Sequence, residues 1–585
     1  MATGIKEQGG CGRSFGIRRF HSLLASQGFG AVASLIAGVA GMMVAGNVAG
    51  VDALSGIAVV LPVSIGAQFV ARLVYCGAGY LFASYQGRMK REEARQIVGL
   101  SIEAALVVGL SVFAVTYFGR DLYLDAVGVT GAVREQAILY WRWIFVFYAY
   151  VPVGMTMWRL VYADGETVTT AVGDTLMAPL TLALTIVFTR ITGTAAGAAQ
   201  GVLVASLSAD LIMVTHVFRK SNAVVPIWNF SWARLRELVS YSMTDSLSKL
   251  CQCGFVAVVN KLVVCTTSSA FLPVVGMVAF VQQLSDLLDR VGDAYSPIAA
   301  MYRGEGNGPA FRGLARCGLS VAVVVGIVVM VGVEVLAPQI VSLYGIPSGP
   351  VYDSAVIALR ISAAVFPVAS VLLFLGSHYL VLDRIVLAVV TTLSTGFLLT
   401  AACAAAFCFT WGLNALWVGL PAGGAMTLVA VAVYSWVFEG HKSPLLIPAF
   451  VKSAFNVTFA PVPEQVVIAR DSVGWFLEGR GIGSATVAHI MLIVEECSMA
   501  IADGCRHPAR VCVEASLAVD RETVALVVRD SGSARDLTDE DAKVTSFRIF
   551  FVASLMRAYE SRRYLNTIGC NRAVFTFARE SGGDA

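Results

Sequence analysis

Three aspartates recur on one apolar segment at a spacing that places them on a single helix face. The segment VQQLSDLLDRVGDAYSP, residues 281–297, carries polar side chains at steps of four, three and four, namely Gln282, Asp286, Asp289 and Asp293. At about 100° per residue these positions fall within a stripe of roughly 60° on a helix. Arg290 follows Asp286 by four residues, where an ion pair can form. Carboxylates this close repel each other, which raises the pKa of one of them and suits it to carry a proton.

The stripe has two interpretations. In the first, it is the polar wall of a transport cavity, with Asp286 or Asp289 as the carboxylate that carries the coupling ion. An ionised side chain at the bilayer centre costs about 2.5–3.5 kcal/mol on insertion scales, so it should face a cavity or an opposite charge. In the second, Asp289, Arg290 and Asp293 lie near the cytoplasmic interface and only stay hydrated. The first interpretation makes the chain a transporter.

Further ionisable residues interrupt other apolar segments. In SMTDSLSKLCQCGF, residues 242–255, Asp245 and Lys249 are four apart, so they either neutralise each other within a helix or form a pair at the membrane surface. Glu103 and Arg142 lie on neighbouring segments and are candidates for a pair. With Asp174 and Gln282, these residues complete the candidates for transport or coupling. The cysteines have no metal-ligand spacing, and we predict neither a catalytic residue nor a metal site.

The composition identifies the bilayer as the surroundings of these residues. The chain has 585 residues, of which 57% are hydrophobic and 14% charged, and its mean hydropathy is +0.74. Soluble domains are about one quarter charged. The net charge of +3 is too small to indicate a nucleic-acid partner. We therefore expect an integral membrane protein that acts on a small-molecule substrate.

Apolar runs long enough to cross a bilayer recur along the chain as far as Gly440. A spanning helix needs about 20 mostly apolar residues. This template predicts an all-α polytopic membrane part with twelve spans, at 24–46, 52–82, 96–118, 136–158, 168–190, 193–217, 238–265, 268–299, 314–338, 353–377, 384–409 and 412–437. The twelve spans divide into two six-helix lobes, residues 1–235 and 236–440.

Positive charge fixes the expected orientation. With the N-terminus in the cytoplasm, the inner loops hold clusters such as Arg88, Lys90, Arg91 and Arg95, whereas the outer loops hold only Arg120, Arg134 and Arg190. Cytoplasmic loops carry the excess of Lys and Arg in membrane proteins. We expect a multi-pass protein of the bacterial cytoplasmic (inner) membrane, with both termini in the cytoplasm.

Two loops share a short motif. SYQGRMKREEARQIVGLS begins at Ser84 and MYRGEGNGPAFRGLARCGLS begins at Met301, so that Tyr85 aligns with Tyr302 and Gly87 with Gly304 at one constant offset. Six spans separate the two loops, which returns the chain to the same side of the membrane. The offset therefore predicts two lobes of equal topology, related by an axis along the membrane normal.

After residue 440 the long apolar runs end, and a mixed pattern of polar and apolar residues follows. We predict a linker at 441–460 and a cytoplasmic α+β domain at 461–585. Alternating apolar residues indicate strands at 511–519, 522–530 and 571–579, and helical periodicity indicates helices at 485–504 and 545–560.

The membrane part resembles the multidrug-and-toxin-extrusion (MATE) transporters. The resemblance lies in VAGNVAGVDALSGIAVVLPV (44–63), GRMKREEAR (87–95), RLVYADGETVTTAVGDTL (159–176) and TGTAAGAAQGVLVASLSADL (192–211). Membership would imply an antiporter that exports amphipathic, often cationic, compounds on a sodium or proton gradient. Many members carry an aspartate in the first span and an Asn/Asp pair in the fifth. Here Gly41, Ala178 and Thr181 stand near those places, so that cation site is missing, and Asp174 lies one turn earlier.

The C-terminal part resembles the GHKL ATPase fold, in the branch of the anti-sigma-factor serine kinases. Glu496, with Glu495 beside it, stands in the place of the catalytic glutamate, and Asp530 and Gly532 retain the adenine-side motif. Ala500 replaces the magnesium-binding asparagine, and Ser546, Phe547 and Arg548 replace the glycines of the phosphate lid. A lid needs glycine because backbone amides must approach the phosphates. The resemblance therefore implies remnants of a nucleotide site, doubtful ATP binding and no catalysis.

The first functional hypothesis is a secondary antiporter, without a cofactor, that uses sodium or protons and carries a regulatory or inert cytoplasmic domain. The second is a membrane-bound signalling protein whose GHKL-like domain binds or sequesters a protein partner. The third is a lipid-linked saccharide flippase of the same superfamily. A flippase would favour a strongly cationic cavity, and the predicted spans hold more acid than base.

Overall fold

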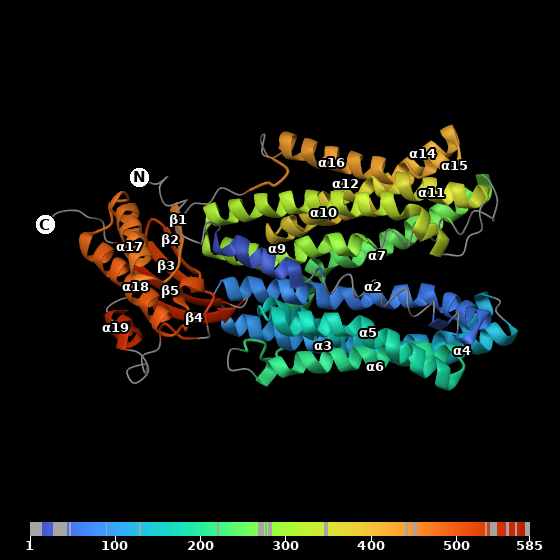
Figure 1. Ribbon diagram of the computed structural model, residues 1–585, viewed down its shortest axis with the longest axis horizontal. Coiled ribbons are helices and arrows are strands. Elements are labelled where there is room, and N and C mark those ends of the chain that lie inside the picture. Colours follow the sequence, from blue (N-terminus) through green and yellow to red (C-terminus); the bar gives the residue numbers. More distant parts are fainter. Residues whose placement is uncertain are drawn as a thin grey trace.

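A computed structural model shows a long helical bundle with a small α+β domain at one end (Figure 1). The domain lies at the end where α2 stops and α3 starts, and we call this the inner end of the bundle. The structure describes residues 14–26, 28, 44–45, 48–88, 90–127, 130–218, 222–266, 274, 278, 284–343, 349–438, 443–447, 453–532, 535–538, 547–556, 561–567 and 570–579.

The helices form two groups that lie side by side along the bundle (Figure 1). The N-terminal lobe contains α2 (Val51–Gly87), α3 (Arg91–Val127), α4 (Gly131–Ala163), α5 (Thr167–Thr192) and α6 (Ala195–Val214), followed by a short 3-10 turn, η2 (Thr215–Phe218). The C-terminal lobe contains α7 (Trp232–Thr266), α9 (Ser285–Glu305), α10 (Gly308–Leu343), α11 (Pro350–Ala363), α12 (Val365–Val381), α13 (Ile385–Leu393), the π-helical turn η4 (Ser394–Leu398), α14 (Leu399–Trp411), α15 (Leu413–Leu416) and α16 (Gly419–Phe438).

The helices confirm a largely helical, multi-pass membrane protein. Ten described helical segments are long and apolar enough to cross a membrane, and one of them, Ser484–Asp503, belongs to the C-terminal domain instead. The predicted first span, 24–46, and the first part of the eighth, 268–283, lie mostly outside the described residues. The count of twelve spans and the lobe boundaries remain predictions.

The constant offset between the two similar loops reappears in the helix boundaries. The separation of Tyr85 from Tyr302, counted onward from Arg91 at the start of α3, leads to Gly308, which is the first residue of α10. The starts of α5 and α6, shifted in the same way, fall within one residue of the starts of α13 and α15. The likeness of two short loops therefore reflects a similar succession of helices in the two lobes.

The lobes pack together at the inner end. One apolar cluster there joins Val74, Ala78 and Leu81 of the N-terminal lobe to Leu238 and Tyr241 of the C-terminal lobe. Toward the far end, the apolar clusters of the described residues each belong to one lobe. The lobe interface is therefore closed by apolar packing at its inner end.

Gly77 allows the closest approach between the lobes. Its amide donates a 2.7 Å hydrogen bond to Ser242 Oγ of α7. A Cβ atom at this position would lie 2.4 Å from the Leu238 carbonyl oxygen, well inside van der Waals contact. The absence of a side chain thus lets α2 and α7 touch.

The C-terminal domain is a five-stranded antiparallel sheet in the order β1-β2-β3-β5-β4. Its elements are β1 (Ser453–Phe459), α17 (Pro463–Glu478), α18 (Ser484–Asp503), the 3-10 turn η5 (Pro508–Arg510), β2 (Val513–Val519), β3 (Thr523–Asp530), α19 (Phe547–Leu555), β4 (Ser561–Thr567) and β5 (Cys570–Ala578). The alternate apolar residues of β2, β3 and β5 pack under the helices.

This domain starts earlier than predicted. β1 pairs with β2 along its whole length, although residues 453–459 fall in the predicted linker 441–460. The helix α17 and the strands β1 and β4 were absent from the sequence prediction, whereas β2, β3, β5, α18 and α19 lie where it placed them. β4 reads SRRYLNT and lies at the sheet edge, so it lacks the apolar alternation of a buried strand.

Candidate functional site

The polar stripe of α9 meets basic residues from three other helices. Lys249 of α7 binds both carboxylate oxygens of Asp286, with N–O distances of 2.8 and 2.9 Å. Asp286 also lies within electrostatic reach of Arg72, on α2 of the other lobe. The carboxylate that the sequence paired with Arg290, on its own helix, is thus held by a lysine from a neighbouring helix.

Asp293 connects the two lobes. Arg159 of α4 forms an ion pair with it at 2.6 Å, while Arg290 approaches its second carboxylate oxygen at 3.5 Å. The side chains of Arg159 and Asp293 are only 16% and 17% exposed. A pair so shielded from water interacts more strongly than one at the surface, because the local dielectric constant is lower. Asp293 is therefore a charged contact across the lobe interface.

For the other predicted residues, the structure shows how buried the side chain is, or does not describe the side chain. Asp289 lies on the same stripe of α9, is half-buried and has an interaction partner. Gln282 and the side chains of Asp174 and Asp245 lie outside the described residues. Glu103 is half-buried and Arg142 exposed, and no ion pair joins these two described side chains. Of the predicted residues, the structure thus brings together Lys249 and Asp286.

Sequence reasoning named Lys249 and Arg290 but missed the two basic residues that the N-terminal lobe adds to this site. Arg72 and Arg159 come from the N-terminal lobe, and together with Lys249 and Arg290 they offset the three aspartates of α9. Four basic side chains thus face three aspartates at this stripe, while the expected excess of acid over base in the spans as a whole remains a prediction. The sequence did contain a sign of their role. Arg72 and Arg159 both interrupt apolar helices, where an ionised group requires a partner or a cavity.

The residues of the sheet domain that the sequence assigned to a nucleotide site contact the chain's own arginines. Arg548 binds Glu496 at 2.7 Å and Asp503 at 3.1 Å, and Arg470 binds Glu495 at 2.9 Å. The Arg535 guanidinium donates a 2.7 Å hydrogen bond to the carbonyl oxygen of Ala500, the residue that replaces the expected asparagine. Both glutamates therefore face positive charge from the protein itself.

Asp530 lines a cavity too small for a base. This cavity has a volume of about 10 Å³, which holds at most one water molecule, and Gly532, Arg535 and Asn571 also line it. The Asp530 carboxylate accepts hydrogen bonds from the Gly532 amide at 2.7 Å and from the Asn571 side chain at 3.0 Å. Burial raises the pKa of Asp530 to about 6. In this conformation an adenine ring has no room beside Asp530.

The opposite face of the sheet carries buried charges that meet the bundle. Glu514, Arg529 and Arg572 stand side by side on β2, β3 and β5. Glu305, at the end of α9, lies between the two arginines and forms ion pairs with both. Arg529 also binds Glu514 at 2.8 Å, and all four side chains are at most 4% exposed. Two acids and two bases thus neutralise one another inside the interface.

The sheet domain touches both lobes. The Asn307 amide of the α9–α10 turn donates hydrogen bonds to Asn456 at 2.7 Å and to Ser516 at 2.8 Å. On the N-terminal lobe, Arg572 donates to the Gln86 carbonyl oxygen at 3.3 Å, and Arg91 donates to the carbonyl oxygen of Tyr564. The domain therefore spans the inner end of the lobe interface.

The N-terminal segment adds a further connection. Residues 15–26 are helical, and Arg19 donates a 2.7 Å hydrogen bond to the Gly165 carbonyl oxygen of the N-terminal lobe. Phe20 and Leu23 pack into an apolar cluster of the C-terminal lobe, and Phe15 packs against cysteines of the sheet domain. The same short helix contacts all three parts.

The two helical lobes of the bundle are similar in fold to solved transporters of the MOP superfamily. The chain matches an outward-facing structure of a multidrug-resistance MATE transporter of that superfamily with a TM-score of 0.67 and 17% identity, covering 72% of this chain and 94% of that one. It matches a MOP-superfamily transporter from Pyrococcus furiosus, described as having a binding pocket of reverse polarity, with a TM-score of 0.66 and 16% identity over 72% and 94% of the chains.

A MATE structure in the straight conformation gives a TM-score of 0.65 and 16% identity, over 72% of this chain and 95% of that one. No protein-family model and no curated protein matches the sequence. The resemblance to MATE transporters is thus confirmed as a likeness of fold. Whether the C-terminal domain is of the GHKL type is untouched by these comparisons.

Proposed function

We propose that the chain is a secondary active antiporter that exports amphipathic small molecules in exchange for protons or sodium, by alternating access of its two lobes. The observation that carries this proposal is the ion pair between Arg159 and Asp293, which links the lobes inside the bundle. The two-lobed transporter fold supports it.

The ion pairs of α9 supply a means of coupling. Opening the inner end requires α4 and α9 to separate, and this breaks the contact between Arg159 and Asp293. A proton or a sodium ion on Asp293 would weaken the attraction and favour opening. Asp286, paired with Lys249 within the C-terminal lobe, offers a second carboxylate for the coupling ion.

The charges at the lobe interface indicate which charge the transported substrate carries. Cationic compounds are the substrates that the MATE resemblance implies, yet Asp286 and Asp293 already have basic partners. The four basic side chains around the stripe favour a second candidate function, the transfer of an anionic, lipid-linked saccharide. Transport assays with a cationic dye and with an anionic lipid-linked substrate separate the two.

We assign the sheet domain a regulatory role. The order β1-α17-α18-β2-β3-α19-β4-β5 suits the GHKL resemblance, but Arg548 and Arg535 bind Glu496 and Ala500, at the positions that the resemblance assigns to the nucleotide site. We therefore expect neither kinase nor ATPase activity. Since the domain contacts both lobes at their closed inner end, it would resist their separation. A signalling role through a captured partner is the alternative for this domain.

The experiment measures gradient-driven flux. The full chain in proteoliposomes should move an organic-cation dye against its gradient when a proton or sodium gradient is imposed. We expect Asp293→Asn to lower the coupled rate at least tenfold, because the amide cannot release or bind the coupling ion.

Glu334→Gln is the matched control. It removes a carboxylate of the same lobe that pairs with Arg360 at 3.9 Å and is 43% exposed. Its flux should equal that of the wild type. Equal flux in Asp293→Asn, or no coupled flux of either substrate class in the wild-type chain, would contradict the proposal.

A further inference from the structure

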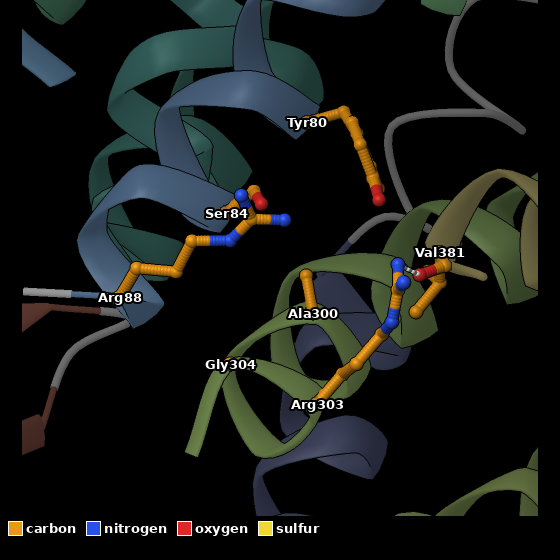
Figure 2. A pocket seen from close by; sticks show the side chains of 7 residues that line it. All are labelled: Tyr80, Ser84, Arg88, Ala300, Arg303, Gly304 and Val381. Carbon is orange, nitrogen blue, oxygen red and sulfur yellow. Dashed lines mark hydrogen bonds between the residues drawn. The ribbon is translucent and has the colours of Figure 1, made fainter. Parts of the chain in front are cut away.

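A second polar cavity lies between the lobes at their inner end (Figure 2). It has a volume of about 260 Å³ and is lined by Tyr80, Ser84, Arg88, Ala300, Arg303, Gly304 and Val381. Arg303 lies ten residues beyond Asp293, the last aspartate of the polar stripe on α9, which corresponds to about 15 Å along the helix axis. The cavity is therefore distinct from the ion pairs of the polar stripe.

Its two arginines come from different lobes. Figure 2 shows Arg88 extending from the end of α2 past Ser84, opposite Arg303 of α9. Arg303 donates to the Val381 carbonyl oxygen and pairs with Asp383 at 2.6 Å. Within the described part of the chain, the Arg88 guanidinium has no hydrogen-bond or ion-pair partner. The residues that line the cavity thus include two arginines and no carboxylate, while Asp383 pairs with Arg303 from outside the lining.

Neutral hydroxyl groups complete the lining. Ser84 presents its hydroxyl to the cavity beside Arg88 (Figure 2), and Tyr80 borders it while donating a 2.9 Å hydrogen bond to the Leu380 carbonyl oxygen. Tyr241 stacks on Tyr80 and donates to Asp383 at 2.6 Å, which holds that carboxylate toward Arg303. Because Tyr80 already uses its proton on Leu380, the hydroxyl donor that the wall offers an oxygen-rich anion is Ser84, beside the Arg88 guanidinium.

We infer that this cavity binds a phosphate group, with Arg88 of one lobe and Arg303 of the other as its charged donors. The planar guanidinium matches phosphate geometry and forms charge-assisted hydrogen bonds with it. The volume is below that of pockets for drug-sized molecules. It suits inorganic phosphate, a small phosphate ester or the headgroup of an anionic lipid. A phosphate held by both arginines would connect the lobes at their closed end.

This inference stands apart from the direction and substrate of transport, because binding is measured without flux. The full chain is reconstituted in phosphatidylcholine nanodiscs, and its thermal unfolding is followed with increasing inorganic phosphate at constant ionic strength. A parallel series replaces part of the phosphatidylcholine with phosphatidic acid. We expect at least one of the two probes to raise the unfolding temperature of the wild-type chain in a saturable manner.

Arg88→Gln should weaken that binding at least tenfold, and Arg88→Lys, which keeps the charge but not the planar group, should weaken it less. Arg316→Gln is the control, since it removes an exposed arginine of α10 that does not line the cavity. An effect of phosphate alone identifies a soluble ligand, an effect of phosphatidic acid alone a lipid headgroup, and an effect of both a site for either source. Absence of both effects, or equal binding by Arg88→Gln and the wild type, would overturn the inference.

Discussion

At the residue scale, Arg529 pairs with two carboxylates in the interface between the sheet and the bundle. Its side chain is 0% exposed and lies between Glu305 and Glu514. Removing one partner from a buried group of charges costs about 3–5 kcal/mol, because the remaining charges lose their compensation. We expect Arg529→Met to lower the local unfolding free energy of β2 and β3 by about that amount, measured by hydrogen exchange of their amides.

Arg470 provides the comparison for that measurement. It is 29% exposed and pairs with Asp471 and Glu495 on the outer surface of the domain. Exposed ion pairs contribute about 0–1 kcal/mol. Arg470→Met should therefore leave the exchange of β2 and β3 almost unchanged. Similar effects of the two variants would show that the buried charges do not stabilise the interface.

Asp530 makes the sheet domain sensitive to pH. Its pKa in the folded chain is raised from 3.8 to about 6 by burial, so the folded state binds a proton more tightly than the unfolded state. The contribution of the protonated Asp530 to the free energy of unfolding is therefore fully present below pH 4 and is lost as the pH rises through 6. A shift of this size corresponds to roughly 2–3 kcal/mol.

Hydrogen exchange of β3, corrected for the intrinsic rate, should accordingly show less protection at pH 7 than at pH 5. The Asp530→Asn variant should lose this difference, because an amide does not titrate. A pH dependence that persists in the variant would assign the effect to another group.

At the element scale, the contact between α2 and α7 depends on Gly77. A methyl group there would lie 2.4 Å from the Leu238 carbonyl oxygen, so the helices must move apart. Overpacking of this kind costs about 1–3 kcal/mol. We expect Gly77→Ala to lower the thermal unfolding temperature of the full chain, since it disturbs the closed inner end.

Gly66→Ala on the same helix is the matched control. Nothing lies within 4 Å of a Cβ atom at that position, and the residue is exposed. Because alanine favours a helix more than glycine does, this variant should be neutral or slightly more stable. A loss of stability equal to that of Gly77→Ala would show that the effect arises from the helix alone.

The elements also show what the sequence reveals. Long apolar helices such as α3 and α10 follow from composition, because length and hydropathy are local properties. The partner of Asp286 does not, because spacing along one helix indicates Arg290 whereas the fold delivers Lys249 from α7. Glu305 belongs to the loop motif that begins at Met301, but the sequence does not reveal its arginine partners, because both lie in the sheet domain. Ion pairs between residues on different helices or strands can therefore be identified only when the tertiary fold is known.

At the scale of the whole molecule, the sheet domain touches the two lobes unequally. Its contact with the C-terminal lobe is a buried charge network, whereas the N-terminal lobe is joined to it by hydrogen bonds to backbone carbonyls, from Arg572 to Gln86 and from the exposed Arg91 to β4. The weaker contact should break first when the inner end opens. We expect Arg91→Gln to raise the rate of gradient-driven flux by about two- to fivefold, consistent with roughly 0.5–1 kcal/mol for one net hydrogen bond.

The control for Arg91→Gln is Arg134→Gln. Arg134, in the first turns of α4, pairs with Asp125 in the last turn of α3, at the far end of the bundle and away from the sheet domain. Its flux should match that of the wild type. A rate in Arg91→Gln at or below that of the control would argue against a restraining role for the domain.

The ion pairs of Glu305 also have a consequence for biosynthesis. Arg529 follows Glu305 by 224 residues, so the ribosome completes the helices of the bundle well before it makes either arginine. Until then the carboxylate has no fixed counter-charge and must remain hydrated. Only a chain translated to its last strands can finish burying this surface, so premature termination should leave a bundle with an exposed inner end that quality-control proteases can recognise.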